Sequence, residues 1–196
     1  LSAVPAWLLV LNVAIYLVSM VARGLCWQLL LQRRVSWKQS VLALNEGYFF
    51  NNILPFRIGE LARAFLLGRR SGLGTFHVLS TIVVERSYDL AIAAGLLLAT
   101  LPLAFGMDWA RPFAVLLLAV VVGGLFLLYL AARNRGWVER QVERAAGRWT
   151  LARRMILPQV HAVLDGFSVL TRVQFFGASL GLLALSWFLA ILRDWA

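Results

Sequence analysis

The segment Pro112–Ala132 reads PFAVLLLAVVVGGLFLLYLAA and contains no charged residue. The hydrocarbon core of a bilayer is about 30 Å thick, so a helix needs roughly 20 mainly apolar residues to cross it. This segment therefore predicts a transmembrane helix. The rest of the chain agrees, because 61% of its 196 residues are hydrophobic and only 14% are charged, unlike a soluble domain. We expect an all-α, polytopic integral membrane protein built as a helical bundle.

Three other segments are long and apolar enough to be further spans. The first carries one charge, Arg23, near its end, and it is too long for the core of a signal peptide, typically about 7 to 15 residues. We expect residues 1–196 to form one transmembrane domain. We also expect this domain to be truncated at both ends, because the sequence begins at Leu1 rather than at a methionine and stops at Ala196 just past an apolar run. The four predicted spans are residues 4–31, 76–101, 112–132 and 175–192.

Basic residues concentrate in three places, at 33–38, 69–70 and 133–154. Loops rich in lysine and arginine face the cytoplasm, so all three are predicted to be cytoplasmic. The link 101–112 has a single arginine and is predicted to lie outside. The first and third spans then run inward, and the second and fourth run outward. This pattern predicts a multi-pass protein of the bacterial cytoplasmic membrane.

The segment 133–172 is predicted to be a basic, amphipathic cytoplasmic segment. Its first part, 133–154, is expected to form one amphipathic helix, with a second amphipathic stretch after it. Basic residues on this helix could bind anionic lipid head groups at about 1 kcal/mol each, or the segment could be a solvated loop that only sets orientation. The predicted basic stripe is Arg140, Arg144 and Arg148, beside the apolar positions Trp137, Val142, Ala145 and Trp149; the second stretch has Ile156, Val160, Val163, Phe167 and Leu170 on one face.

Residues 39–68 have basic segments on both sides and must therefore leave the membrane by the face they enter. Pro55 divides them into two limbs of about 14 residues, each about 20 Å long as a helix and too short to cross. This predicts a re-entrant helical hairpin that enters from the cytoplasm. Irregular backbone at membrane depth must be buried in protein or line a water-filled cavity. We therefore expect Asn51 and Asn52 in a buried polar pocket, satisfying free backbone groups.

Two sets of charged residues belong to apolar segments. Arg57, Glu60 and Arg63 are spaced to share one helical face, and Glu85, Arg86 and Asp89 lie in the next span. Charged residues inside a membrane usually mark a substrate path, but these sets could instead pair with each other and fasten the hairpin, or do both. The neighbouring carboxylates favour a structural role for Arg86, and Gly59 leaves room for a backbone or a head group to approach.

The stretches YFFNNILPFRIGELARAFLLGRRSG (48–72) and VVERSYDLA (83–91) resemble the signature of the lysylphosphatidylglycerol synthase transmembrane family. This family includes the flippase-like domain of the multiple peptide resistance factor and its stand-alone relatives. ARGLCWQLLL (22–31) is also similar to the preceding helix of the family, although Cys26 stands where a further arginine is expected. The signature is matched by Asn51, Pro55, Arg57, Gly59, Glu60, Arg63, Glu85, Arg86 and Asp89.

The resemblance implies a flippase or transporter that moves a phospholipid, or a related isoprenoid or glycolipid, between leaflets. Its partner would be a membrane lipid with an anionic or lipid-linked head group. No aminoacyl-transferase domain accompanies this segment, so the resemblance implies no synthase activity. The resemblance assigns lipid binding to Asn51, Asn52, Arg57, Glu60, Arg63, Glu85, Arg86 and Asp89, and structural roles to Pro55 and Gly59.

Two other functions stay open. One is a transferase that acts on a polyprenyl phosphate or a phospholipid with Glu85 or Asp89 as general base; the other is a non-transporting scaffold subunit. With one cysteine and two isolated histidines, His77 and His161, the sequence predicts no disulfide, no metal site and no cofactor. In so apolar a chain the net charge of +10 indicates an anionic membrane surface rather than nucleic acid. The partners compatible with this pattern are membrane lipid and further copies of the chain in a homo-oligomer.

Overall fold

The structure is a computed structural model that describes residues 6–53, 58–100, 109–146 and 150–195. These residues form eight α-helices and one 3-10 helix, with no strand among them, so the all-α prediction is confirmed. The helices are α1 (Ala6–Leu30), α2 (Trp37–Ile53), α3 (Gly59–Ser71), α4 (Thr75–Thr100), α5 (Ala110–Arg133), α6 (Arg135–Ala146), α7 (Thr150–Phe167), η3 (Ser168–Thr171) and α8 (Val173–Trp195).

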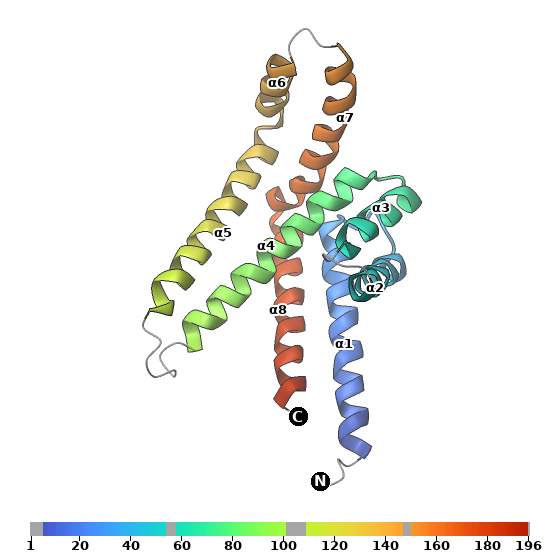
Figure 1. Ribbon diagram of the computed structural model, residues 1–196, viewed down its shortest axis with the longest axis vertical. Coiled ribbons are helices and arrows are strands. Elements are labelled where there is room, and N and C mark those ends of the chain that lie inside the picture. The colour runs from blue at the N-terminus through green and yellow to red at the C-terminus, as the bar shows by residue number, and fades with distance from the viewer. Residues whose placement is uncertain (1–5, 54–57, 101–108, 147–149, 196) are drawn as a thin grey trace.

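The long helices run roughly along one direction (Figure 1). α1 and α8 lie side by side and antiparallel, and α4 crosses the bundle obliquely, with α5 beside it. Both chain termini lie at one end, and α4 and α5 approach that same end. The junctions α1–α2 and α3–α4 point toward the opposite end, where α6 and α7 extend furthest. The short helices α2 and α3 pack beside α1 and α4.

Among the described residues, three helices are long and apolar enough to cross a membrane: α1, α5 and Val173–Asp194 of α8. Their outward side chains are apolar and exposed, as expected for surfaces that face lipid; Leu17, Phe126 and Phe188 are examples. α4 is equally long but carries three charged residues near its middle, so its crossing stays a prediction.

The buried core lies toward the α1–α2 junction rather than at the ends where the termini lie. Trp27 and Leu30 of α1 pack in a cluster with Val78 and Val84 of α4 and with Val169 of η3, all almost fully buried. Most of the N-terminal half of α1 is exposed. The core therefore fixes the ends of the helices that surround the charged residues.

The prediction of one continuous basic helix over 133–154 is wrong. α6 ends at Ala146 and α7 begins at Thr150, and the two helices pack against each other (Figure 1). Arg148 and Trp149 lie outside the described residues, whereas Arg140 and Arg144 are exposed on α6. The reversal brings the apolar face of α7 onto α4 and buries its last residue, Phe167.

A charged cluster holds α7 to the end of α1. Asp165 accepts a hydrogen bond from Arg34 at 2.8 Å and lies 3.4 Å from Arg135. The side-chain amide of Gln32, a residue in the left-handed region with φ of 54°, donates to the Asp165 carbonyl oxygen at 3.2 Å. This left-handed turn ends α1 and directs the chain into α2.

The two histidines have carboxylate neighbours, contrary to their isolated positions in the sequence. His77 Nδ1 lies 3.8 Å from Asp165 Oδ2, and His161 Nε2 lies 3.4 Å from Glu139 Oε1. Both contacts join different helices, α4 with α7 and α6 with α7, so the spacing of the histidines in the sequence gave no sign of them. Within the described residues, no group of three or more His, Cys, Asp or Glu side chains could hold a metal ion.

Candidate functional site

The α2–α3 hairpin is closed by two glycines and one asparagine. A Cβ atom added to Gly59 would lie 2.0 Å from the Gly47 carbonyl oxygen, so the space beside Gly59 is occupied by backbone. Asn51 Oδ1 accepts a hydrogen bond from Gly59 N at 2.8 Å and so satisfies a free N–H at the start of α3. This is the role expected for Asn51. The predicted residues Pro55 and Arg57 lie outside the described residues.

Arg63 and Glu85 form a buried ion pair between α3 and α4. Arg63 Nη2 lies 2.7 Å from Glu85 Oε2, and the two side chains are 3% and 0% exposed. The Arg63 guanidinium carbon also lies 4.7 Å from the centre of the Trp27 ring, close enough for a cation–π interaction. This contact joins α1 to the pair. The hairpin is therefore fastened to the bundle by a charge pair that water does not reach.

Arg23 forms a second connection, between α1 and three other helices. Its guanidinium pairs with Asp89 of α4 and donates to the Tyr48 hydroxyl of α2 at 3.1 Å. The Trp187 indole of α8 donates to the same Asp89 oxygen at 2.9 Å. Arg23 Nε also lies 3.9 Å from Glu85 Oε1, so the two connections meet.

Arg86 is the third arginine of the cluster, and it is the most exposed. Its Nε atom lies 3.0 Å from Glu60 Oε1, and its Nη1 atom lies 3.0 Å from Asp89 Oδ2. The side chains of Arg86 and Glu60 are 37% and 33% exposed. With Arg23 and Arg63 against Glu85 and Asp89, the three arginines face three carboxylates. The pairing alternative raised by the sequence is thus observed, except for Arg57, whose contacts are not described.

A polar cavity of about 360 Å³ lies against this cluster, between α2, α3 and α4. The predicted site residues Glu85 and Asp89 do not line it, but they bind the arginines that do. The residues that line it include Tyr48, Asn51, Asn52, Glu60, Arg63 and Arg86.

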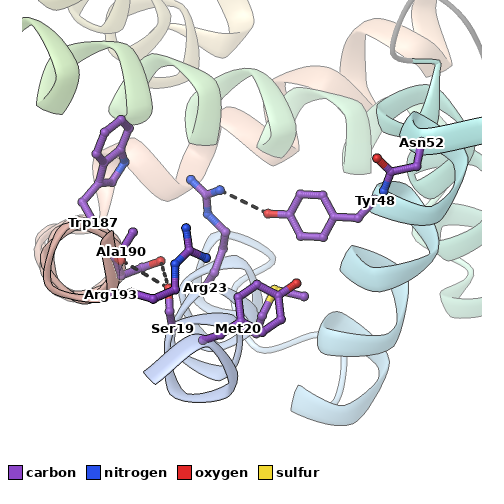
Figure 2. A pocket seen from close by; sticks show the side chains of 10 residues that line it. Ser19, Met20, Arg23, Tyr48, Asn52, Trp187, Ala190 and Arg193 are labelled. Atoms are coloured by element: carbon purple, nitrogen blue, oxygen red, sulfur yellow. Dashed lines mark hydrogen bonds between the residues drawn. The ribbon is translucent and has the colours of Figure 1, made fainter. Parts of the chain in front are cut away.

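A second cavity of about 410 Å³ lies along the seam between α1 and α8. Figure 2 shows Arg23 and Arg193 side by side in this cavity, with Ser19 beneath them and Trp187 at one side. Tyr48 and Asn52 extend toward it from α2, and both residues line the first cavity as well. The hairpin cavity and this mixed polar and apolar cavity thus share two lining residues, Tyr48 and Asn52.

Four residues of this arrangement were not among the predicted site residues: Arg23, Tyr48, Trp187 and Arg193. Arg23 had a signal, since it is the only charge in the first apolar run. Trp187 had none, because aromatic residues are common throughout the chain, whereas Tyr48 is the first residue of the signature stretch 48–72 but is not one of its matched positions. Arg193 follows an apolar run directly, where a basic residue ordinarily marks the end of a span.

Fold and site together define an all-α membrane protein with a balanced cluster of ion pairs and two adjoining polar cavities between its helices. The chain belongs to the family described as the lysylphosphatidylglycerol synthase TM region, whose family model matches residues 1–196. No curated protein and no solved structure matches it. Membership of this family gives the chain a role connected with membrane lipid.

Proposed function

We propose that the protein is a lipid transporter that moves a phospholipid, or a related isoprenoid or glycolipid, between the leaflets of a bacterial cytoplasmic membrane. The observation that carries this proposal is that the hairpin cavity and the α1–α8 cavity, both lined by arginine, tyrosine and asparagine side chains, share Tyr48 and Asn52. A lipid head group is polar and must be kept from the hydrocarbon core as it crosses. Adjoining polar cavities between apolar helices offer it such a path.

The proposed path begins at a re-entrant hairpin formed by α2 and α3. Ion pairing of Arg70 with Glu46 at 2.7 Å, together with the Asn51–Gly59 contact, makes the two helices antiparallel. With 17 and 13 residues, they are about 26 and 20 Å long at 1.5 Å per residue, both shorter than the hydrocarbon core. The chain enters and leaves this hairpin near basic residues, which supports entry from the cytoplasmic face.

In this proposal, the head group binds in the hairpin cavity and passes Tyr48 and Asn52 into the α1–α8 seam. Arg86 and Glu60 are each about one-third exposed, so they can reach a phosphate and a cationic group respectively. Arginine binds phosphate through paired hydrogen bonds, which suits an anionic phospholipid or a lipid-linked phosphate. Arg193 in the seam offers a second cation farther along α8. We expect Arg57 to contact the phosphate near the hairpin tip.

The transferase alternative has weaker support. Glu85 has no exposed surface and accepts from Arg63, and Asp89 is paired with Arg23 and Arg86, so neither is a free general base. A scaffold is favoured only by the ion pairs, which fasten the hairpin whatever its function. Mass spectrometry of lipids after incubation with the purified protein distinguishes the transferase hypothesis from the other two, because only a transferase would change the lipid covalently.

The test is translocation of a labelled anionic phospholipid in vesicles that contain the full-length protein. We expect Arg57→Gln and Asn52→Leu to abolish translocation while thermal stability in detergent stays close to that of the wild type. Asn45→Leu is the matched control, since Asn45 lies on the same helix and its amide donates to Val41 of that helix. A stable Arg57→Gln protein that moves lipid at the wild-type rate would refute the proposal.

A further inference from the structure

A third cavity, of about 370 Å³, lies on a different side of α4 from the ion pairs. Its floor is formed by Tyr88 and Ala91 of α4. Val122 and Phe126 of α5 form one wall, and Phe176 and Leu180 of α8 form the other. η3 packs against α5 above it, and its residue Leu170 closes that end. The result is an apolar groove between two helices that are long enough to span the membrane.

The composition of this groove determines what it can hold. Its lining is aliphatic or aromatic, and its only polar side-chain atoms are the hydroxyls of Tyr88 and Tyr129. The Tyr129 hydroxyl already accepts from Arg133 and the Tyr88 hydroxyl is buried, so the groove offers few partners for water or for a head group. Val122 and Phe126 on one wall are more than half exposed, so the groove opens to the surroundings of α5. In a membrane those surroundings are hydrocarbon. The occupant that suits the groove is therefore a hydrocarbon chain.

Two arginines stand at the closed end of the groove, one on each wall. Arg133 is one helical turn beyond the lining residue Tyr129, and its Nη1 atom donates to the Tyr129 hydroxyl at 2.7 Å. Arg172 directly precedes the lining residue Val173. Both arginines are exposed, and neither has a carboxylate partner among the residues that the structure describes. They place two positive charges beside this end of the groove, which the basic segments predict to face the cytoplasm.

We propose that this groove binds one anionic phospholipid of the cytoplasmic leaflet, with an acyl chain in the groove and the phosphate between Arg133 and Arg172. The site is separate from both polar cavities and does not depend on the transport proposal. Charge complementarity identifies the occupant, because unpaired cations beside an apolar groove match an anionic head group on a hydrocarbon chain. Each arginine near the membrane surface should strengthen binding about fivefold, which corresponds to about 1 kcal/mol.

The direct test uses phosphatidylglycerol with a photoreactive group midway along one acyl chain and the full-length protein in lipid nanodiscs. Cross-linked residues are mapped by mass spectrometry. We expect labelling of Val122, Phe126 and Phe176 to exceed labelling of Leu116 and Val120, which are exposed on another face of α5. Equal labelling of the two groups would show ordinary contact with bulk lipid and would overturn the proposal.

Two variants test the head-group and chain contacts separately. Changing both Arg133 and Arg172 to glutamine should reduce the affinity for phosphatidylglycerol about 25-fold. The same change at Lys38 and Arg69, two exposed basic residues of other segments, should leave it unaltered. Ala91→Phe should fill the floor of the groove and remove its labelling. If Ala91→Phe fails to fold, the affinity of the arginine double variant and the cross-linking pattern of the wild type still test the proposal. Wild-type protein whose groove residues are labelled equally by phosphatidylglycerol and phosphatidylcholine probes would also refute the site.

Discussion

Arg63→Met should destabilise the protein strongly, because it removes one partner of a buried ion pair. Breaking such a pair typically costs about 3 to 5 kcal/mol, since it leaves an uncompensated charge out of water. Glu85 keeps Arg86 at 3.5 Å and Arg23 at 3.9 Å, which favours the lower end of that range. In a chain of this size each kcal/mol lowers the melting temperature by about 2 to 4 °C. We therefore expect a decrease of at least about 6 °C, measured by thermal unfolding in detergent.

The matched control is Arg70→Met. Arg70 Nη1 lies 2.7 Å from Glu46 Oε1, the same distance as in the buried pair, but these side chains are 50% and 22% exposed. An exposed pair contributes about 1 kcal/mol or less. The two variants thus differ in burial and not in geometry. Equal decreases in melting temperature would refute the claim that burial makes the Arg63–Glu85 pair the main fastening of the hairpin.

A double variant tests the reason for the loss. Arg63→Met combined with Glu85→Leu leaves no charge stranded, because Arg23 retains Asp89 and Arg86 retains Glu60. Replacement of a whole buried pair by apolar residues is often neutral. We expect the double variant to recover most of the stability lost in Arg63→Met. Additive losses would show instead that packing around Arg63, and not its charge, stabilises the hairpin.

Two further outcomes concern other contacts. Gly59→Ala should open the hairpin and lower the melting temperature by several degrees, because the added Cβ would lie 2.0 Å from the Gly47 carbonyl oxygen. Gly95→Ala should be tolerated, because a Cβ there would have no neighbour within 4 Å. Similar melting temperatures for the two variants would contradict this prediction. Burial alone would raise the pKa of Asp165, but the hydrogen bond and charge of Arg34 and the charge of Arg135 hold it below its ordinary value. A lowered pKa in the folded state adds stability above about pH 4, which is lost as the pH falls through the folded pKa. Asp165→Asn should therefore lower the melting temperature at pH 7 and lose that effect in acid, and an effect independent of pH would disprove the ion-pair explanation.

Much of the fold follows from local sequence, because apolar length and charge position are local quantities. The predicted span 112–132 corresponds to α5, Ala110–Arg133, and the family signature carries both Arg63 and Glu85. The break between α6 and α7 could not be read in this way, since helical periodicity continues across it. It depends on tertiary packing, in which Gly166 of α7 meets α4 so closely that an added Cβ would lie 1.8 Å from Ser80 Oγ.

Partners across the bundle were the least predictable part of the site. Spacing in a helix predicts neighbours three or four residues apart, and it identifies Arg86 with Asp89 correctly. It cannot predict the ion pair between Arg23 of α1 and Asp89 of α4, or the hydrogen bond from Trp187 of α8 to Asp89. These contacts exist because four helices converge on one region of the core. Only the cost of leaving a charge unpaired in an apolar run could indicate beforehand that Arg23 has some partner.

In the proposed transport path, the difference in burial between the ion pairs determines which carboxylate a head-group phosphate can displace from its arginine. The sequence favoured a structural role for Arg86, but the structure leaves its side chain 37% exposed at the wall of the hairpin cavity. A phosphate that displaced Glu60 from Arg86 would leave a carboxylate that water can reach, so the exchange strands no charge. Displacing Glu85 from Arg63 would strand a fully buried carboxylate. We therefore infer that head-group binding proceeds by exchange at the Arg86–Glu60 pair, while the Arg63–Glu85 pair stays closed and holds the hairpin in place.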